Sequence, residues 1–304
     1  MSKDEFPNIL TLDVEEWFQV QNLADSIPKV SWHRLPSRVE VGLNLFLDIL
    51  DEYDVKATFF ILGWIVLRFP QVVGKIVKRG HEAACHGWEH EMISRMNAGS
   101  FRDETDAAAT AIADIAGKPV MGYRAPTFSI NKDNLWAFEI LGELGFKYDS
   151  SVYPIRRERY GMPGFPRYPV RLDLPSGADL VEFPLPTMRL PGMNLPVGGG
   201  GYLRFWPYAM TKKAVELLNF SGVPAVVYLH PWELDPDQPR ILQGSQIKRW
   251  MHYHNLSQTE TNLRNLLIDF KFTTMEEAYR NSYEKMEFYR PEGDSWLSST
   301  DSIK

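Results

Sequence analysis

Short apolar runs alternate with amphipathic stretches along most of the chain, and this alternation restricts the fold more than any other feature. The runs have the length of buried strands, while the longer stretches carry apolar residues at helical spacing. Strands that alternate with helices of about 10–15 residues form parallel βαβ units, in a barrel or a doubly wound sheet. The pattern predicts strands at residues 8–12, 57–62, 82–86, 120–124, 180–184 and 225–230 and helices at 39–53, 70–79, 100–116, 132–144 and 207–220.

Two parts of the chain depart from this alternation. Residues 154–201 are rich in proline and glycine and are too long for an ordinary connection, which predicts a functional or mobile segment. Residues after about 280 are polar and are expected to fray. The 304 residues contain neither an internal repeat nor a clear linker, and α/β barrels of this length often form one domain. We therefore expect a single domain over residues 1–304.

The composition excludes several classes of protein. The formal net charge is −6 and there is no basic run, which argues against nucleic acid or an anionic membrane surface as the main partner. The single cysteine, Cys85, excludes an internal disulfide and a zinc site built from several cysteines. The polar start of the chain is unlike a secretory signal, and no apolar run reaches the roughly 18 residues of a membrane span. We expect a cytoplasmic protein without a transmembrane segment.

Ionisable residues follow several of the predicted strands, at the end where α/β barrels carry their active sites. Asp13 and Glu15 end the first strand, and their spacing of two places both carboxylates on the same side of an extended chain. Such a pair suits one metal ligand and one general base. Acidic pairs in front of an aromatic residue are more often solvated, or cap the next helix.

Two histidines follow the third strand. In a helical turn, His86 and His90 would lie on one face, close enough to bind one metal ion. Histidines at this spacing are often simple loop residues, and the sequence lacks the zinc-protease pattern because Glu89 directly precedes the second histidine. Cys85 is expected to be a small buried strand residue rather than a ligand.

Two further strand ends carry chemistry. Arg124 could clamp a carboxylate, and Pro126 could hold the backbone so that the N–H of Thr127 points into the cavity; a surface salt bridge of Arg124 is equally compatible. His230 ends an apolar strand, where it is either a general acid or base or a core histidine. Together these residues describe a mononuclear metal hydrolase.

At this point the sequence resembles the polysaccharide deacetylases, the NodB-homology esterases of carbohydrate esterase family 4. The motifs that carry the resemblance lie within about residues 7–235: Asp13-Val14-Glu15, His86-Gly87-Trp88-Glu89-His90, Arg124-Ala125-Pro126 and Leu229-His230-Pro231-Trp232. Residues 249–254 and 266–270 resemble the C-terminal extension of the branch tied to exopolysaccharide and exosortase loci, which places an extension at about 236–285. The resemblance implies an α/β fold, a distorted (β/α)₇ barrel of the NodB-homology type, and one divalent metal, usually Zn²⁺, with Co²⁺, Ni²⁺ or Mn²⁺ as alternatives.

The resemblance also implies roles for individual residues. Asp13 corresponds to the catalytic base, Arg124 to the residue that orients it, and His230 to the catalytic acid. His86 and His90 correspond to metal ligands; because Val14 replaces the second aspartate of the usual motif, Glu15 is expected to supply the metal carboxylate. The motif that normally positions the acid histidine is altered, which leaves Asp149 as a candidate partner. The substrate-binding surface is expected to include Thr127, Phe128, Trp88, Leu229 and Trp232.

Three functions are compatible with these features. The first is hydrolysis of the N-acetyl amide of an amino sugar in a polysaccharide or its precursor. The second is hydrolysis of a small cyclic amide or ureide, as in allantoinase-like relatives; exposed aromatic residues such as Trp17, Trp88 and Trp232 in an open groove would favour sugar, and a closed pocket the small molecule. The third is a non-catalytic carbohydrate-binding barrel. The sequence contains no serine-hydrolase elbow, P-loop or dinucleotide motif, and a homo-oligomer is compatible with it.

Overall fold

The computed structural model describes residues 7–157, 160–191, 193–292 and 295–298. Within them, seven strands run parallel in the order β10-β1-β2-β3-β4-β5-β7. They are β1 (Asn8–Val14), β2 (Thr58–Ile61), β3 (Glu82–Cys85), β4 (Gly122–Tyr123), β5 (Tyr148–Asp149), β7 (Asp179–Glu182) and β10 (Val226–Leu229). This arrangement confirms the predicted parallel α/β barrel of seven strands.

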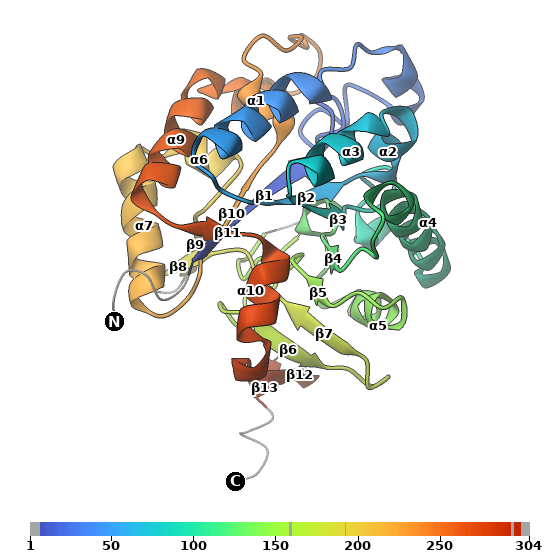
Figure 1. The fold of residues 1–304 in the computed structure, drawn as a ribbon, viewed down its shortest axis with the longest axis vertical. Coiled ribbons are helices and arrows are strands. Elements are labelled where there is room, and N and C mark those ends of the chain that lie inside the picture. The colour runs from blue at the N-terminus through green and yellow to red at the C-terminus, as the bar shows by residue number, and fades with distance from the viewer. Residues whose placement is uncertain (1–6, 158–159, 192, 293–294, 299–304) are drawn as a thin grey trace.

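Helices surround the strands on the outside (Figure 1). They are α1 (Val39–Glu52), α2 (Gly63–Arg68), α3 (Gln71–Lys78), α4 (Ala98–Ala116), α5 (Trp136–Glu143), α6 (Gly201–Phe205), α7 (Tyr208–Phe220) and α9 (Thr259–Asp269). Local signals set their ends: the Asn97 side chain caps α4 by accepting from the Ser100 N–H at 2.9 Å, and Gly117 ends it with a φ of 70°. The sequence pattern predicted five of these helices and missed the short α2 and α6 and the later α9.

Alternating side chains of the strands build two cores. Leu10, Leu12 and Val14 belong to the large cluster shared with the surrounding helices. Ile9 belongs to a second cluster that also contains Phe60 and Tyr228, from the two neighbouring strands, and this cluster fills the barrel interior. Because successive side chains of a strand point to opposite faces, Thr11 and Asp13 share the inward face with Ile9.

The barrel is distorted because β7 and β10 do not pair with each other in the described part of the chain. Gly199 instead forms a parallel bridge with Tyr228 of β10, and the Gly200 N–H donates to the Tyr228 carbonyl at 2.9 Å. A Cβ on Gly199 would lie 2.4 Å from the Tyr228 ring, so this approach requires glycine. The glycine-rich run therefore lies along β10 as an ordered segment.

The two regions that depart from the predicted alternation also contain strands. Residues 154–201 include β6 (Val170–Asp173), antiparallel to β7, and a hairpin of β8 (Thr187–Leu190) and β9 (Met193–Pro196). Beyond residue 280 the chain forms β12 (Phe288–Glu292), parallel to β6, and β13 (Ser295–Ser298). The prediction of a frayed end was wrong for these residues, because pairing with β6 orders a polar stretch that has no apolar period of its own.

The segment after residue 236 packs on the barrel. It contains α8 (Gln246–Tyr253), then α9, β11 (Phe272–Thr273) and α10 (Met275–Ser282). β11 pairs with the start of β1, and the fully buried Met275 of α10 joins the interior cluster at that end (Figure 1). No helix in the described ranges is long and apolar enough to span a membrane.

Candidate active site

The end of β1 directs two carboxylates to one point. Asp13 and Glu15 are each 2% exposed, so they are not the solvated pair that the alternative interpretation described. The Nε2 atom of His230 lies 4.0 Å from Oδ2 of Asp13 and 3.8 Å from Oε1 of Glu15. The strand ends β1 and β10 therefore bring these three side chains together.

His86 and His90 also reach this point, but by a loop rather than a helical turn. The backbone between β3 and the 3₁₀ turn η2 (Ile93–Arg95) is irregular, with left-handed conformations at Gly87 (φ 74°) and His90 (φ 54°). The expected helical turn was wrong, although the two rings still converge. The Nε2 atom of His90 lies 2.7 Å from Oε2 of Glu15, and one potential ligand atom from each of Glu15, His86 and His90 lies within 4.8 Å of the others.

These three side chains fit a divalent cation. The Nδ1 atom of His86 lies 2.8 Å from the Arg124 carbonyl oxygen, so it carries the proton and leaves the Nε2 lone pair free for a metal. Burial lowers the pKa of His86 to about 4, which keeps the ring neutral. Oε2 of Glu15 is buried and makes no hydrogen bond, despite its short contact with His90. Two imidazoles and one carboxylate are a donor set that suits zinc.

Glu15 is held as an anion. Burial by itself would raise its pKa, but His90 and His230 outweigh this effect and lower the pKa to about 2. Its second oxygen, Oε1, accepts a hydrogen bond from the indole N–H of Trp232 at 3.0 Å. The indole is itself sandwiched between His230 and His252, at centroid distances of 5.1 and 4.3 Å. The His252 ring, on α8, is fixed by Gln238 at 2.8 Å.

Arg124 is the ion-pair partner of Asp13. Its guanidinium is fully buried and donates to Oδ1 of Asp13 at 2.6 Å and to the Thr11 hydroxyl at 2.8 Å. Its remaining N–H groups reach the carbonyl and the hydroxyl of Ser150, and the cation lies 4.1 Å from the Phe60 ring centre. The surface salt bridge is excluded, because Arg124 is a buried clamp on Asp13.

Asp149 does not contact His230. It faces Glu182, its partner across β5 and β7, and accepts a hydrogen bond from the Ser151 hydroxyl at 2.6 Å. Burial raises the pKa of Asp149 to about 6 and raises that of Glu182 as well, since two adjacent buried carboxyls do not both ionise readily. The proposed pairing of Asp149 with the acid histidine was wrong.

Glu233, and not Asp149, is the carboxylate that contacts Nδ1 of His230. Its Oε2 atom lies 2.8 Å from Nδ1 of His230, and its Oε1 atom accepts from the buried Arg204 at 2.8 Å. Burial alone would lower the pKa of His230, but Glu15, Glu233 and Asp13 together raise it to about 9. The imidazole is therefore protonated at neutral pH in this arrangement, with Nε2–H directed at the carboxylates of β1.

The turn after Arg124 has unusual backbone geometry. Thr127 (φ 59°) and Phe128 (φ 52°) are both left-handed within the 3₁₀ turn η3 (Pro126–Phe128). No acceptor for the Thr127 N–H is found among the described residues, whereas the Phe128 N–H bonds the Ala125 carbonyl. Consecutive left-handed residues without glycine are strained, and such strain concentrates at functional sites. The Phe128 ring packs against Tyr228 at 4.9 Å, beside His230.

Two known protein families match adjoining parts of the chain. Residues 40–148 match the family described as Polysaccharide deacetylase. The chain contains a polysaccharide deacetylase domain. Residues 150–280 match a second family, described as a domain of unknown function (DUF3473), so the two families together extend from α1 to α10.

Several curated relatives of the deacetylase domain align with parts of the chain. A peptidoglycan deacetylase of Helicobacter pylori is 34% identical over 113 residues, which are 37% of this chain and 38% of that protein. A bifunctional xylanase/deacetylase of Pseudobutyrivibrio xylanivorans is 43% identical over 86 residues, 28% of this chain and 14% of the relative. The chain thus spans well under half the length of these relatives.

One solved structure extends the likeness to the whole chain. A protein of Mycobacterium smegmatis assigned to the polysaccharide deacetylases superposes with a TM-score of 0.61, at 20% identity, over 96% of this chain and 97% of its own. This likeness shows the fold, including the segments beyond the deacetylase match.

Three residues of the predicted substrate surface, Leu229, Trp88 and Trp232, are partly or fully covered. Leu229 is 1% exposed and packs in the core outside the barrel, so its assignment was wrong. Trp88 is half-buried against α2, with ring atoms 2.3 Å from where a Gly63 Cβ would stand. Trp232 is 7% exposed and Trp17 only 1%, so neither forms the exposed platform that would favour sugar.

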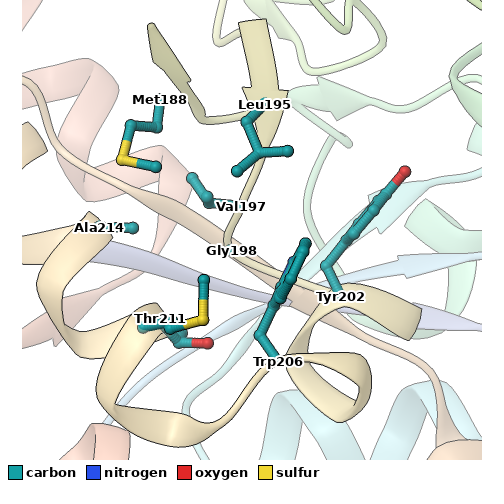
Figure 2. A pocket seen from close by; sticks show the side chains of 9 residues that line it. Met188, Leu195, Val197, Gly198, Tyr202, Trp206, Thr211 and Ala214 are labelled. Atoms are coloured by element: carbon teal, nitrogen blue, oxygen red, sulfur yellow. The ribbon is translucent and has the colours of Figure 1, made fainter. Parts of the chain in front are cut away.

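A cavity elsewhere in the fold is too small to be the site. It measures about 20 Å³ and lies between the β8–β9 hairpin and helices α6 and α7 (Figure 2), with room for about one water molecule. Its lining is mostly apolar and contains none of the predicted catalytic or metal-binding residues: Met188, Leu195, Val197, Gly198, Tyr202, Trp206, Met210, Thr211 and Ala214.

Sequence reasoning missed the residues that support the predicted catalytic side chains. Glu233 had a usable signal, because it follows His230 by three residues at the start of a short helical turn, η4 (Pro231–Leu234). Arg204 and His252 had none, since they reach the site only through contacts between distant segments.

Proposed function

We propose that this protein hydrolyses the N-acetyl amide of an amino sugar in a polysaccharide or its precursor. One observation carries the proposal: Asp13, clamped by Arg124, and His230, clamped by Glu233, meet next to the Glu15–His86–His90 donor set. Amide hydrolysis needs a base for the attacking water and an acid for the leaving amine, and this arrangement offers both. The names of the curated relatives, which are deacetylases, support an N-acetylated glycan as substrate.

Glu15, His86 and His90 would hold one divalent metal ion, for which zinc is the best match to two imidazoles and a carboxylate. When bound, such an ion polarises the amide carbonyl and lowers the pKa of water. The chain prepares this site in advance, because the Arg124 carbonyl fixes His86 and the Trp232 indole fixes Glu15.

Asp13 acts as the general base. Arg124 forms an ion pair with Oδ1 of Asp13, which leaves Oδ2 of Asp13 to accept the proton of the attacking water. The buried guanidinium fixes the orientation of the Asp13 carboxylate. Oδ2 of Asp13 lies 4.0 Å from Nε2 of His230. The base and the acid would therefore act on the same amide group of the substrate.

His230 acts as the general acid. Because Nδ1 is engaged by Glu233, the proton that can be transferred is on Nε2, which faces the site. Nε2–H protonates the departing sugar amine as the C–N bond breaks, and the amine leaves as a neutral product. The Thr127 N–H has no acceptor among the described residues and is held by strained backbone, so it would donate to the oxygen that gains negative charge.

The deciding experiment measures acetate release from a panel of N-acetylated oligosaccharides, with cyclic ureides as the competing class. We expect acetate from at least one glycan, no ureide ring opening, and no acetate with His86→Ala. Ureide hydrolysis without acetate release would assign the second function. Tight glycan binding without any turnover, in protein shown to carry metal, would assign the non-catalytic function.

A further inference from the structure

The outer face of α8 is apolar and exposed. Ile247, Trp250 and Met251 are 72, 57 and 40% exposed, and their i, i+3, i+4 spacing puts them on one face of the helix. Leu242, in the loop just before α8, is 78% exposed. We call these four residues the α8 patch. Single exposed apolar residues are ordinary, but a contiguous group of this kind marks an interaction surface.

The surroundings of the α8 patch are basic. Residues 238–259 contain Arg240, Lys248 and Arg249 and no aspartate or glutamate, although the chain as a whole has 39 acidic residues and a net charge of −6. Lys248 pairs with Asp25. Neither Arg240 nor Arg249 forms an ion pair with a described residue: Arg240 lies over the Tyr253 ring at 4.4 Å, and Arg249 donates to backbone carbonyls of the loop. The net charge of the chain therefore hides a local positive excess.

A groove joins the two arginines to the apolar residues. It has a volume of about 330 Å³ and lies between the 240–242 loop and α8, where Arg240 and Arg249 line it together with Leu242, Trp250 and Tyr253. It offers guanidinium groups for an anion next to apolar side chains.

We infer that the α8 patch docks on an anionic membrane surface. Exposed Ile, Leu, Met and Trp side chains enter the boundary between headgroups and acyl chains, while flanking Arg and Lys side chains meet lipid phosphates; this is the pattern of an interfacial amphipathic helix. A sugar chain fits less well, because Leu242 and Ile247 offer nothing to hydroxyl groups. A symmetric second copy also fits less well, because the same patch on both copies would bring arginines together.

The position of α8 relates this docking to the site. The inner side of the helix carries His252, which stacks on Trp232, and Trp232 holds Glu15. Docking through the outer side therefore brings the carboxyl end of the barrel close to the lipid. If the protein acts on a glycan, as proposed above, the docking implies that this glycan is held at a membrane. This part of the inference rests on the proposed function.

The test is co-sedimentation of the metal-free chain with vesicles of phosphatidylcholine alone or mixed with phosphatidylglycerol, without any substrate. We expect binding to the anionic vesicles only, weakened by salt. The double variant Ile247→Ser/Trp250→Ser should lower the partition coefficient about tenfold or more. The matched control is Phe220→Ser/Ile268→Ser, which removes two residues of α7 and α9 that are 90 and 67% exposed and should bind like the parent.

Three results would overturn docking: no binding to anionic vesicles, equal loss in both double variants, or a dimer in sedimentation velocity that Ile247→Ser dissociates. A lack of acetate release in the deacetylase assay leaves the vesicle result unchanged, because the binding assay contains neither metal nor glycan.

Discussion

Glu233 binds Nδ1 of His230 at 2.8 Å from a position only three residues further along the chain. The same carboxylate accepts from Arg204, whose guanidinium also donates to the backbone carbonyl of His252 at 3.1 Å. The proposed catalytic acid, His230, is thus fixed by its own strand end and, through Arg204, by the segment after residue 236. Burial would raise the pKa of Glu233, but Arg204 and His230 lower it below its usual value, so the carboxylate stays charged.

Replacing Glu233 by glutamine should lower kcat strongly while the protein retains its metal. The amide keeps the size of the side chain but loses the charge that holds His230 in its tautomer and orientation. The loss in kcat should approach the ~10²–10⁴-fold that a general acid contributes. Steady-state kinetics and metal analysis of Glu233→Gln and Asp149→Asn check this. Asp149→Asn should remain much closer to the parent, since Asp149 does not touch His230; the reverse order would restore Asp149 as the partner.

The Trp232→Phe variant should weaken metal binding about 10–100-fold, the usual effect of losing an outer hydrogen bond to a ligand. Phenylalanine keeps an aromatic ring between His230 and His252 but removes the N–H that binds Glu15. Trp17→Phe is the matched control, because its indole N–H bonds only the Pro36 carbonyl, at 3.1 Å. Competition with a chromogenic chelator measures both affinities. Equal affinity in the two variants would show that the Trp232 N–H does not support metal binding.

The Asp13→Asn variant should keep its metal and lose most of its turnover. The amide still accepts a hydrogen bond from Arg124 but is not a base, so the attacking water loses its proton acceptor. Metal content and acetate release are measured on the same preparation, with circular dichroism to verify folding. Loss of metal together with activity would instead make Asp13 a ligand and Glu15 a bystander.

The sequence predicted the strand ends because their signals are local. An apolar run followed by a charged residue identified Asp13, Arg124 and His230, and parallel strands bring such ends to one edge of a barrel. The spacing of two in β1 correctly placed Glu15 beside Asp13, since it depends only on strand geometry. The helical spacing of His86 and His90 predicted that the two side chains converge, but for the wrong reason, because left-handed backbone at Gly87 and His90 replaces the helix.

What the sequence did not predict depends on contacts between distant segments. Arg204 reaches Glu233, and His252 reaches Trp232, only after α6 and α8 pack against the strand ends. Asp149 was the natural choice by motif position, yet its register with Glu182 turns it away from His230. Strands β12 and β13 carry no apolar period and form by pairing with β6.

The free energy of unfolding should depend on pH through Glu82, which lies at the start of β3, at the end of the barrel opposite the candidate active site. This buried carboxyl of β3 accepts from the Thr58 hydroxyl at 2.6 Å, from the Tyr148 hydroxyl, and from the Glu276 N–H in the first turn of α10 at 3.0 Å. Burial is the main cause that raises its pKa from 4.5 to about 7. The folded state therefore binds this proton more tightly than the unfolded chain does.

The stability gained from this proton is present below about pH 4.5 and is lost as pH rises through about 7. At about 1.4 kcal/mol per pKa unit, the difference between a pKa of 4.5 and one of about 7 corresponds to roughly 3 kcal/mol of unfolding free energy. Glu82→Gln keeps an acceptor but cannot ionise, so its stability should fall less than that of the parent between pH 5 and pH 8. Urea denaturation of the metal-free proteins measures this, with Glu143→Gln, at an exposed position of α5, as control. Parallel pH curves for the parent and Glu82→Gln would show that Glu82 is ionised throughout this range and that the α10 contact does not depend on its proton.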